Sequence, residues 1–364
     1  MALTDPRIRF FIGSGCPIAT TSLYRCTHLS EQLQNLGHQT RLEDWFDESR
    51  IRIESALEHD VIVLYRLPMS GPIRELIESA AEAGKPVIFD TDDLVFEPEL
   101  TVWHRAVRDL SPADQVQHLN GVRRYLMTLM AADAVMVATP VLAELARKRG
   151  KLALVHRNAL GKEMEQLAEQ LSLERGSDPG KKIVVGYGSG TATHDVDFQE
   201  AAPALARLFE HYPEMELWIA GPLNLPATLD RYGDRIRRIA VSGWQDWFRL
   251  MKKMDIALAP LELNNVFCEA KSEIKFVEAG ALGVPVVASR VAPYCAAITN
   301  GVNGSLASNE EEWVTALSAL IEDRGLRARI GKAAELTVRE KYGSRARTND
   351  LRQLLVELEH KLGR

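Results

Sequence analysis

Short runs rich in β-branched and aromatic residues alternate with amphipathic stretches along most of the chain. The runs are RIRFFIG, DVIVLYR, KPVIFDTD, DAVMVAT and LALVHRN in the first half, and KIVVGYG, MELWIAG, RIRRIAV, DIALAPL and VPVVAS in the second. This alternation is typical of parallel sheets covered by helices. The pattern therefore predicts an α/β protein with two doubly wound domains.

The intervening stretches have the spacing of helices that bury one face. The first example is a run of apolar positions separated by three or four residues: Phe198, Ala201, Ala202, Leu205, Leu208 and Phe209. Trp313, Ala316, Leu317, Leu320 and Ile321 repeat the pattern. Both sets place their apolar side chains on one stripe of a helix, so both are expected to face a core.

A polar stretch rich in Gly and Pro, Glu174–Lys182, separates the two series of elements. A chain of 364 residues exceeds the size of one ordinary core, which favours two domains. We expect the first domain to cover residues 1–175 and the second to begin at 182.

Composition narrows the function classes. The net charge of −6 gives no overall attraction to nucleic acid, and no apolar run approaches the ~18 residues of a membrane span. The start, MALTDPRIRFFIGSG, lacks the apolar core of a signal peptide, so a cytoplasmic location is expected. The four cysteines lie far apart without a Cys-x-x-Cys pair, which favours reduced thiols over disulfides or zinc.

Two small-residue loops follow strands, where α/β proteins bind ligands. GSGCPIATTS, Gly13–Ser22, leads into a helix expected over Tyr24–Leu36, and GYGSGTATHD opens the second domain. Each is either a plain strand-to-helix turn or a cradle of backbone N–H groups for an anionic or hydroxyl-rich ligand. The dinucleotide fingerprint fails in both, at Ile18 and Thr191, and no Walker loop is present.

FDTDDLVF places Asp90, Asp92 and Asp93 at the end of a strand. The carboxylates could bind a metal, accept a proton or hold sugar hydroxyls, or they could cap the next segment and pair with an arginine such as Arg66. Either Asp92 or Asp93 is expected to be functional. No two histidines have metal-ligand spacing, so the sequence predicts no metal site.

The segment CEAKSEIKFVEAGALGVPVVAS concentrates charge ahead of a strand. If 272–282 is helical, Lys271, Lys275 and Glu278 share one stripe. Two lysines near a helix start oppose the macrodipole, unless a bound diphosphate compensates and Glu278 accepts hydrogen bonds from a ribose. The alternative is a surface ladder of salt bridges.

KSEIKFVEAGALGVPVVAS, with GVNGSLASNEEEWVTALSALIEDRGLRARIG, VVGYGSGTATHDVDF, LWIAGPLNLP and MDIALAPLELNNVF, resembles the nucleotide-sugar-binding half of GT-B glycosyltransferases of the family 4 type. YRLP and GKPVIFDTDDLVF resemble a subgroup of bacterial cell-surface polysaccharide assembly. The resemblance implies two Rossmann-like domains facing across a cleft, with the nucleotide-sugar domain over 182–343 and a helix over 344–364 returning to the first domain. It also implies a retaining transferase that needs no metal or obligatory cofactor.

The resemblance assigns roles to individual residues. Glu278 matches the glutamate that holds the donor ribose, and Lys275 and Lys271 match cations at the diphosphate. The complete expected donor site is Gly15, Gly188, Ser189, Gly190, Thr191, His194, Gly221, Asn265, Phe267, Lys271, Ser272, Lys275 and Glu278. The expected catalytic set is Lys275, Glu269, Asp93, Asp92 and His104, of which the last three would orient the acceptor.

One position departs from the family pattern. The usual glutamate spacing would put the sugar-contacting residue at Ala270, so Glu269, Asn265 or Phe267 would have to take its place. Two alternatives stay open: a GT-B nucleotide-sugar epimerase, and a nucleotide-sugar-binding module without catalysis. Because related acceptors are often lipid-linked, Arg147, Lys148, Arg149 and Lys151 are either a membrane contact or cations at a helix C-terminus before Gly150. The sequence leaves the donor base and sugar, the acceptor, the linkage and the oligomeric state open.

Overall fold

The computed structural model describes residues 3, 5, 7–17, 22–102, 105–173, 182–190 and 194–363, with the side chain of Ala106 left out. Ile18, His104, Thr191 and nearly all of the expected linker at 174–182 lie outside the described residues. The chain forms two compact units. The first comprises residues 1–161, 270–272 and 344–364, and the second comprises 162–269 and 273–343.

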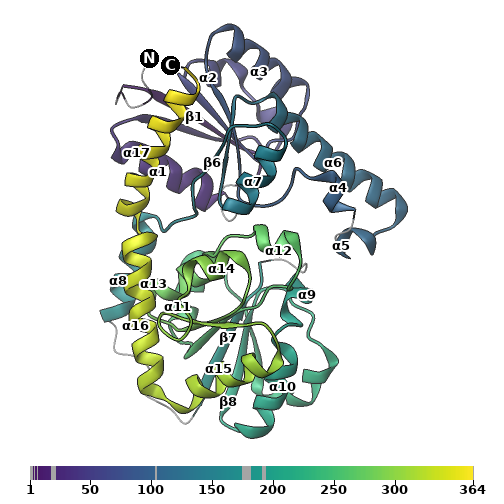
Figure 1. The fold of residues 1–364 in the computed structure, drawn as a ribbon, viewed down its shortest axis with the longest axis vertical. Coiled ribbons are helices and arrows are strands. Elements are labelled where there is room, and N and C mark those ends of the chain that lie inside the picture. Colours follow the sequence, from purple (N-terminus) through teal and green to yellow (C-terminus); the bar gives the residue numbers. More distant parts are fainter. Residues whose placement is uncertain are drawn as a thin grey trace. The chain divides into compact units, whose positions relative to one another are not determined.

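The first unit is built on a parallel sheet of six strands in the order β2-β1-β3-β4-β5-β6 (Figure 1). The described strands are β1 (Arg9–Ser14), β2 (Gln39–Asp44), β3 (Val61–Tyr65), β4 (Val87–Thr91), β5 (Ala134–Val137) and β6 (Ala153–Val155). The described helices are η1 (Leu23–Thr27, a π-helix), α1 (His28–Asn35), η2 (Glu48–Arg50), α2 (Ile53–Leu57), α3 (Gly71–Glu82), α4 (Pro98–Thr101), α5 (Arg105–Arg108), α6 (Pro112–Ala131), α7 (Pro140–Lys148) and α17 (Ser344–Lys361). Chain order reverses between β1 and β3, which makes their carboxyl ends the switch point of this sheet.

The second unit repeats this plan with the strand order β12-β11-β10-β7-β8-β9. Its described strands are β7 (Ile183–Gly188), β8 (Met215–Ala220), β9 (Ile236–Ile239), β10 (Ile256–Ala259), β11 (Val286–Ser289) and β12 (Ser305–Ala307). Its described helices are α8 (Lys162–Leu173), α9 (Asp195–Phe198), α10 (Ala202–His211), η4 (Ala227–Arg235, a 3-10 helix), α11 (Trp244–Met251), α12 (Val266–Ala270), α13 (Ile274–Ala281), α14 (Ala292–Ala297), α15 (Glu310–Glu322) and α16 (Arg324–Lys341). The switch point lies between β7 and β10.

All ten strands expected from the hydrophobic runs are present, and the α/β prediction is confirmed. The pattern missed two strands at sheet edges. β2 has the polar sequence QTRLED and pairs with β1 alone. As an edge strand, it lacks the apolar run of a central strand. β12 has only three residues. Short or polar edge strands give a weak periodic signal.

The apolar helix faces form the cores as expected. Phe198, Ala201, Ala202, Leu205, Leu208 and Phe209 are each at most 2% exposed, although a turn divides them between α9 and α10. In the first unit α17 runs beside α1 and buries Leu351, Leu355 and Leu358 against the sheet core (Figure 1). Helix α8 precedes the expected linker but belongs to the second unit, where it contacts α11.

Candidate functional site

The segment that carries the lysines does not form one helix, so the prediction of a shared stripe for Lys271, Lys275 and Glu278 is wrong. α12 ends at Ala270 and α13 starts at Ile274, which leaves Lys271 in the bend between them. The carbonyl of Ala270 accepts a hydrogen bond from the Thr139 hydroxyl at 2.9 Å instead of serving a continuous helix. Only Lys275 and Glu278 therefore remain neighbours on a helix.

Helix α13 ends just before Gly283. Gly283 adopts φ +68°, a left-handed conformation that stops α13, and the N–H of Val284 then bonds to the carbonyl of Ala279 at 3.0 Å. Close packing fixes the other face of the helix: a Cβ on Gly280 would lie 2.7 Å from Cγ2 of Val338 on α16. These contacts hold α13 in one position beside the sheet of the second unit.

Lys275 and Glu278 lie at the carboxyl end of β7. The Lys275 ammonium donates to the carbonyl of Gly188 at 2.5 Å and lies 5.1 Å from the centre of the Tyr187 ring. Glu278 Oε2 accepts a hydrogen bond of 3.0 Å from the indole N–H of Trp247 on α11. The cation and the carboxylate are therefore held beside the small-residue loop that follows the strand.

Glycine is required at two points of this loop region. A Cβ on Gly188 would lie 2.6 Å from the Trp247 ring. Gly221, after β8, has φ +83°, and a Cβ there would lie 2.0 Å from the carbonyl oxygen of Ser189. The Ser189 N–H in turn bonds to the Ala220 carbonyl at 2.8 Å. The glycines let the backbones that end β7 and β8 touch, which shapes the loop.

Asp197 joins the start of α9 to the loop after β10. Its carboxylate is 2.8 Å from Nδ1 of His194 and accepts from the Glu262 N–H at 3.1 Å and the Cys268 thiol at 3.3 Å. The same loop is ordered by Asn265, whose side-chain oxygen accepts from the Phe267 N–H at 2.9 Å. The expected donor residues His194, Asn265 and Phe267 thus belong to one hydrogen-bonded region of the second unit.

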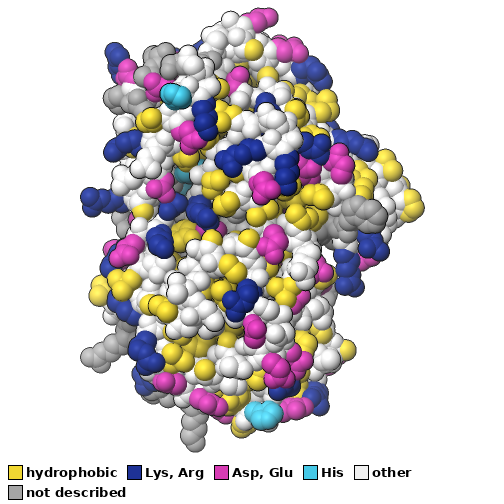
Figure 2. Space-filling view, viewed as in Figure 1, with side chains coloured by type: hydrophobic (Ala, Val, Ile, Leu, Met, Phe, Trp, Pro, Cys, Tyr) yellow, Lys and Arg dark blue, Asp and Glu magenta, His cyan; other side chains and the backbone are white. Residues whose placement is uncertain are grey.

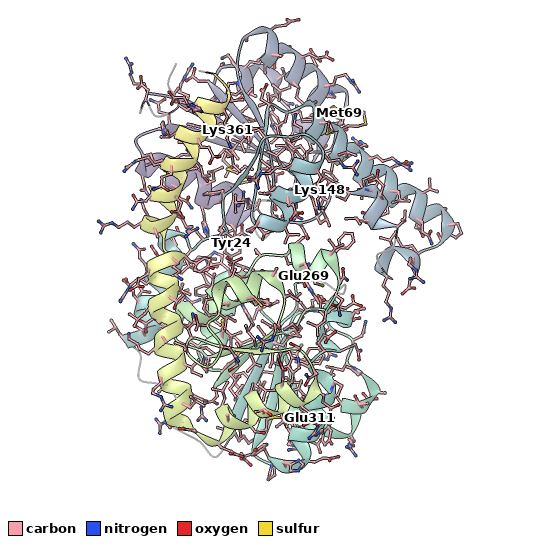
Figure 3. All side chains as sticks on the ribbon, in the orientation of Figure 1. Tyr24, Met69, Lys148, Glu269, Glu311 and Lys361 are labelled. Atoms are coloured by element: carbon pink, nitrogen blue, oxygen red, sulfur yellow. The ribbon has the colours of Figure 1, made fainter. Side chains whose placement is uncertain are left out.

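Glu269 has a defined contact of its own. It lies on α12 (Figure 3), and its Oε2 accepts a 2.6 Å hydrogen bond from the backbone N–H of Ala292, at the start of α14. Neighbouring Ala270 is fully buried. The departure from the family spacing therefore puts an apolar side chain inside the protein and the adjacent carboxylate on a backbone amide.

In the first unit Asp90 forms a buried ion pair. Arg25 donates to both of its carboxylate oxygens, at 2.8 and 2.6 Å, and both side chains are fully buried. Burial raises the pKa of Asp90, and the Arg25 charge opposes that shift. Arg25 also contacts the carbonyl of His156 and, at 3.3 Å, the side-chain oxygen of Asn158. This arrangement is structural, because neither charge reaches the surface.

The Asp92 carboxylate is already engaged in two hydrogen bonds within the first unit. Its Oδ1 accepts from the Tyr65 hydroxyl at 2.8 Å and from Arg66 at 2.6 Å. This is the arginine pairing that the sequence left open as an alternative to function. Asp93 is 3.6 Å from the same guanidinium, and its side chain is 37% exposed. Asp93 is therefore the more accessible of the two expected acceptor residues.

Backbone strain marks the same edge of the first sheet. Arg66 has φ +45°, which a residue with a Cβ rarely adopts. A Cβ on Gly15 would lie 2.2 Å from the Arg66 carbonyl oxygen, so only glycine fits between the ends of β1 and β3. Gly15 therefore has a packing role at the switch point. Ser272, another expected donor residue, is grouped with this unit and accepts from Asn158 at 3.1 Å.

The basic cluster after α7 is engaged in contacts within the first unit. Arg149 pairs with Glu97 at 2.6 Å and with Glu99, and Lys148 (Figure 3) lies 2.8 Å from Glu144. Arg147 donates to the Ala153 carbonyl at 2.7 Å and Lys151 to the Met130 carbonyl at 3.1 Å. Gly150 has φ +78°, as a helix cap requires. The contacts are those of cations at a helix C-terminus.

Charges of both signs are interspersed over the face shown in Figure 2. Among the described residues, no three histidine, cysteine, aspartate or glutamate side chains gather in a metal-binding arrangement. No helix in the described part of the chain is long and apolar enough to span a membrane.

A comparison with known protein families gives a match in the second unit. Residues 185–323 match the family model described as Glycosyl transferases group 1. Apart from residues 270–272, this match lies within the second unit. The matched residues include Lys275, Glu278, Gly188 and Trp247. No curated protein matches the sequence significantly.

Solved structures similar to the whole chain show its fold. Anabaena Alr3699/HepE in complex with UDP and glucose is 15% identical, with a TM-score of 0.63 over 96% of this chain and 100% of that one. Sucrose-phosphate synthase from Thermosynechococcus elongatus is 13% identical, with a TM-score of 0.64 over 98% and 100%. A putative UDP-N-acetylglucosamine 2-epimerase from Listeria monocytogenes is 14% identical, with a TM-score of 0.55 over 98% of each chain. The chain therefore has the two-domain GT-B fold.

Sequence reasoning missed four residues that organise these regions: Arg25, Tyr65, Asn158 and Trp247. Arg25, Tyr65 and Trp247 are single side chains within elements whose periodicity indicates only a helix or strand, and Asn158 lies in the loop between β6 and α8. Their partners lie far along the chain, for instance Asp90 at 65 residues from Arg25 and Glu278 at 31 residues from Trp247. Spacing within one element carries no signal for such contacts.

Proposed function

We propose that this glycosyltransferase moves a sugar from a nucleotide diphosphate donor to an acceptor with retention of configuration and without a metal. The observation that carries the proposal is the position of Lys275 and Glu278. They lie beside the loop after β7, at the switch-point edge of the group 1 glycosyltransferase domain. A cation and a carboxylate one helical turn apart fit the diphosphate and the ribose of one nucleotide.

In this mechanism the leaving diphosphate is stabilised by charge and by backbone donors. Lys275 supplies a positive charge at the end of β7, and the adjoining loop, with open space around Gly190, would supply backbone N–H groups. The departing phosphate oxygen takes the acceptor proton on the same face of the sugar, so no separate base is needed. Glu269 would contact the sugar, and Asp93, with Asp92 held by Arg66, would orient the acceptor from the first unit.

Two motifs of the first unit bear on the acceptor class. YRLP and FDTDDLVF, the motifs that resemble polysaccharide-assembly enzymes, form the strained, charged edge of β3 and β4. Adjacent hydroxyls of a glycan suit carboxylates held in this way. We therefore propose a glycan or lipid-linked glycan as acceptor.

A thermal-shift panel tests the donor site. Wild type and Glu278→Ala are heated with UDP, GDP, dTDP, ADP and CMP sugars and with NAD, and Glu357→Ala serves as an exposed control on α17. We expect one nucleotide sugar at millimolar excess to raise Tm by roughly a few degrees, and the Glu278 variant to lose the effect. A response to NAD alone, or to nothing, would refute the proposal.

The epimerase alternative is consistent with the fold alone, because a solved structure titled as a putative epimerase is among the similar ones. Product analysis separates the two activities. An epimerase releases an isomerised donor in the absence of any acceptor, whereas a transferase consumes the donor only when an acceptor glycan is present. A protein that binds the donor and does neither would be the binding module without catalysis.

A further inference from the structure

Four residues at the end of β7, Gly188, Trp247, Lys275 and Glu278, are connected by contacts and by helix α13. The Trp247 ring covers Gly188, and its indole N–H donates to Glu278 at 3.0 Å. Glu278 and Lys275 occupy one face of α13, and Lys275 returns to the Gly188 carbonyl at 2.5 Å. Three separate elements, β7, α11 and α13, are thereby tied together at one point.

The geometry points to Trp247 as a positioning residue for donor binding: its indole N–H fixes the Glu278 carboxylate in the orientation that receives the ribose hydroxyls. This inference rests on the proposed function. It adds a residue outside the glutamate and lysine motif, on a helix to which the sequence assigned no part in the site.

The contact suits orientation because the indole is rigid and donates only one hydrogen bond. A carboxylate has two oxygens, and Trp247 engages Oε2. Glu278 is partly exposed, so its side chain would otherwise sample several rotamers, each with an entropic cost on binding. The ring itself is fixed by Gly188, because there is no side chain at that position to displace it.

Gly188 also connects the residue proposed to bind the diphosphate with the residue that positions the ribose-binding carboxylate. The same glycine residue supports the Trp247 ring and accepts from Lys275 through its carbonyl. The group that faces the ribose and the group that faces the diphosphate are therefore held at a fixed separation. A Trp247→Phe substitution removes the indole N–H and keeps an aromatic ring, so the hydrogen bond to Glu278 can be tested separately from the packing on Gly188.

The test compares Trp247→Phe, Glu278→Ala and the double variant by calorimetric titration with UDP, GDP, ADP and dTDP. Phenylalanine keeps an aromatic ring over Gly188 and loses the N–H. Trp244→Phe, on the same helix, is the matched control, since Trp244 packs edge-on against Phe248. Thermal melts without ligand verify that each variant is folded.

We expect Trp247→Phe to raise the Kd of the nucleotide that binds wild type by about three- to ten-fold, the equivalent of one hydrogen bond. In the Glu278→Ala background the same change should alter Kd by less than about two-fold, because its effect passes through the carboxylate. The 2′,3′-dideoxy form of that nucleotide should bind wild type and Trp247→Phe equally. With donor sugar, KM should rise while kcat stays near that of wild type.

The outcomes separate the two proposals. If none of the four nucleotides binds wild type, or if Glu278→Ala binds as well as wild type, the proposed donor site is wrong and this inference falls with it. If Glu278→Ala weakens binding but Trp247→Phe does not, only the positioning role is refuted. Additive losses in the double variant, or equal losses with the dideoxy nucleotide, would reduce Trp247 to a packing residue.

Discussion

The buried pair Arg25–Asp90 gives the sharpest stability prediction. Arg25→Met replaces a charged side chain by an apolar one of similar length and leaves the Asp90 carboxylate fully buried without its cation. Removing one partner of such a pair costs about 3–5 kcal/mol. At roughly 2–4 °C per kcal/mol for a domain of this size class, the Tm of the first unit should fall by roughly 6–20 °C.

Calorimetry and urea unfolding at pH 7 measure this loss. The double variant Arg25→Met/Asp90→Leu removes both charges and should recover to within about 2 kcal/mol of wild type. In the single variant a protonated Asp90 avoids the buried charge, so the deficit should shrink as the pH is lowered toward 4. Lys148→Ala, which removes an exposed cation, is the control and should leave the melting temperature almost unchanged.

Two results would contradict this reasoning. A single variant within about 1 kcal/mol of wild type would mean that the carboxylate reaches water or another cation. A double variant as unstable as the single one would mean that the arginine acts through its contacts with His156 and Asn158 rather than through the charge of Asp90.

Three further predictions concern pH, backbone and acceptor. Burial lowers the pKa of His28 to about 4, so from pH 6.5 down to 4 the unfolded chain binds a proton at this residue that the folded chain does not, and His28 alone should lower the unfolding free energy by roughly 3 kcal/mol over that range. His28→Gln should remove this part of the dependence in urea titrations, and the part that remains comes from groups such as His156 and His38, whose pKa values burial also lowers. Gly221→Ala forces a Cβ against Ser189 at φ +83° and should lower unfolding stability by at least about 1 kcal/mol, whereas Gly190→Ala, with open space around it, should be neutral by the same measurement. Asp93→Asn should lower kcat of transfer and leave donor Kd unchanged; an unchanged kcat would place the acceptor contacts elsewhere.

The central strands of both sheets could be predicted from the sequence because each is a continuous apolar run. Parallel strands buried on both faces leave this signature, as in VIVLY of β3 and IALA of β10, where all residues are buried. β2 was missed because this edge strand is largely polar, and β12 because it has only three residues.

The helix expected over residues 272–282 is present from Ile274 to Ala281, but the stripe expected to include Lys271 does not form, for a reason that lies outside the segment. The charge spacing favoured Lys271, Lys275 and Glu278 on one helix face, but Thr139 donates to the carbonyl of Ala270 and Asn158 donates to the hydroxyl of Ser272. A tertiary contact from more than a hundred residues away overrode the local preference. The Glu278 and Lys275 positions were predictable from the motif, whereas the partner Trp247 was not.

The return of α17 to the first unit has a consequence for synthesis on the ribosome. The second unit is almost entirely encoded between two parts of the first, so it can be completed while the first still lacks a helix. Until residues 344–361 emerge, Leu29 and Leu33 of α1 lack the leucines of α17 that cover them in the finished protein. A nascent chain that has emerged only as far as the end of α16 would therefore carry a complete second unit and a first unit with an exposed apolar flank, which is a state that a chaperone would recognise.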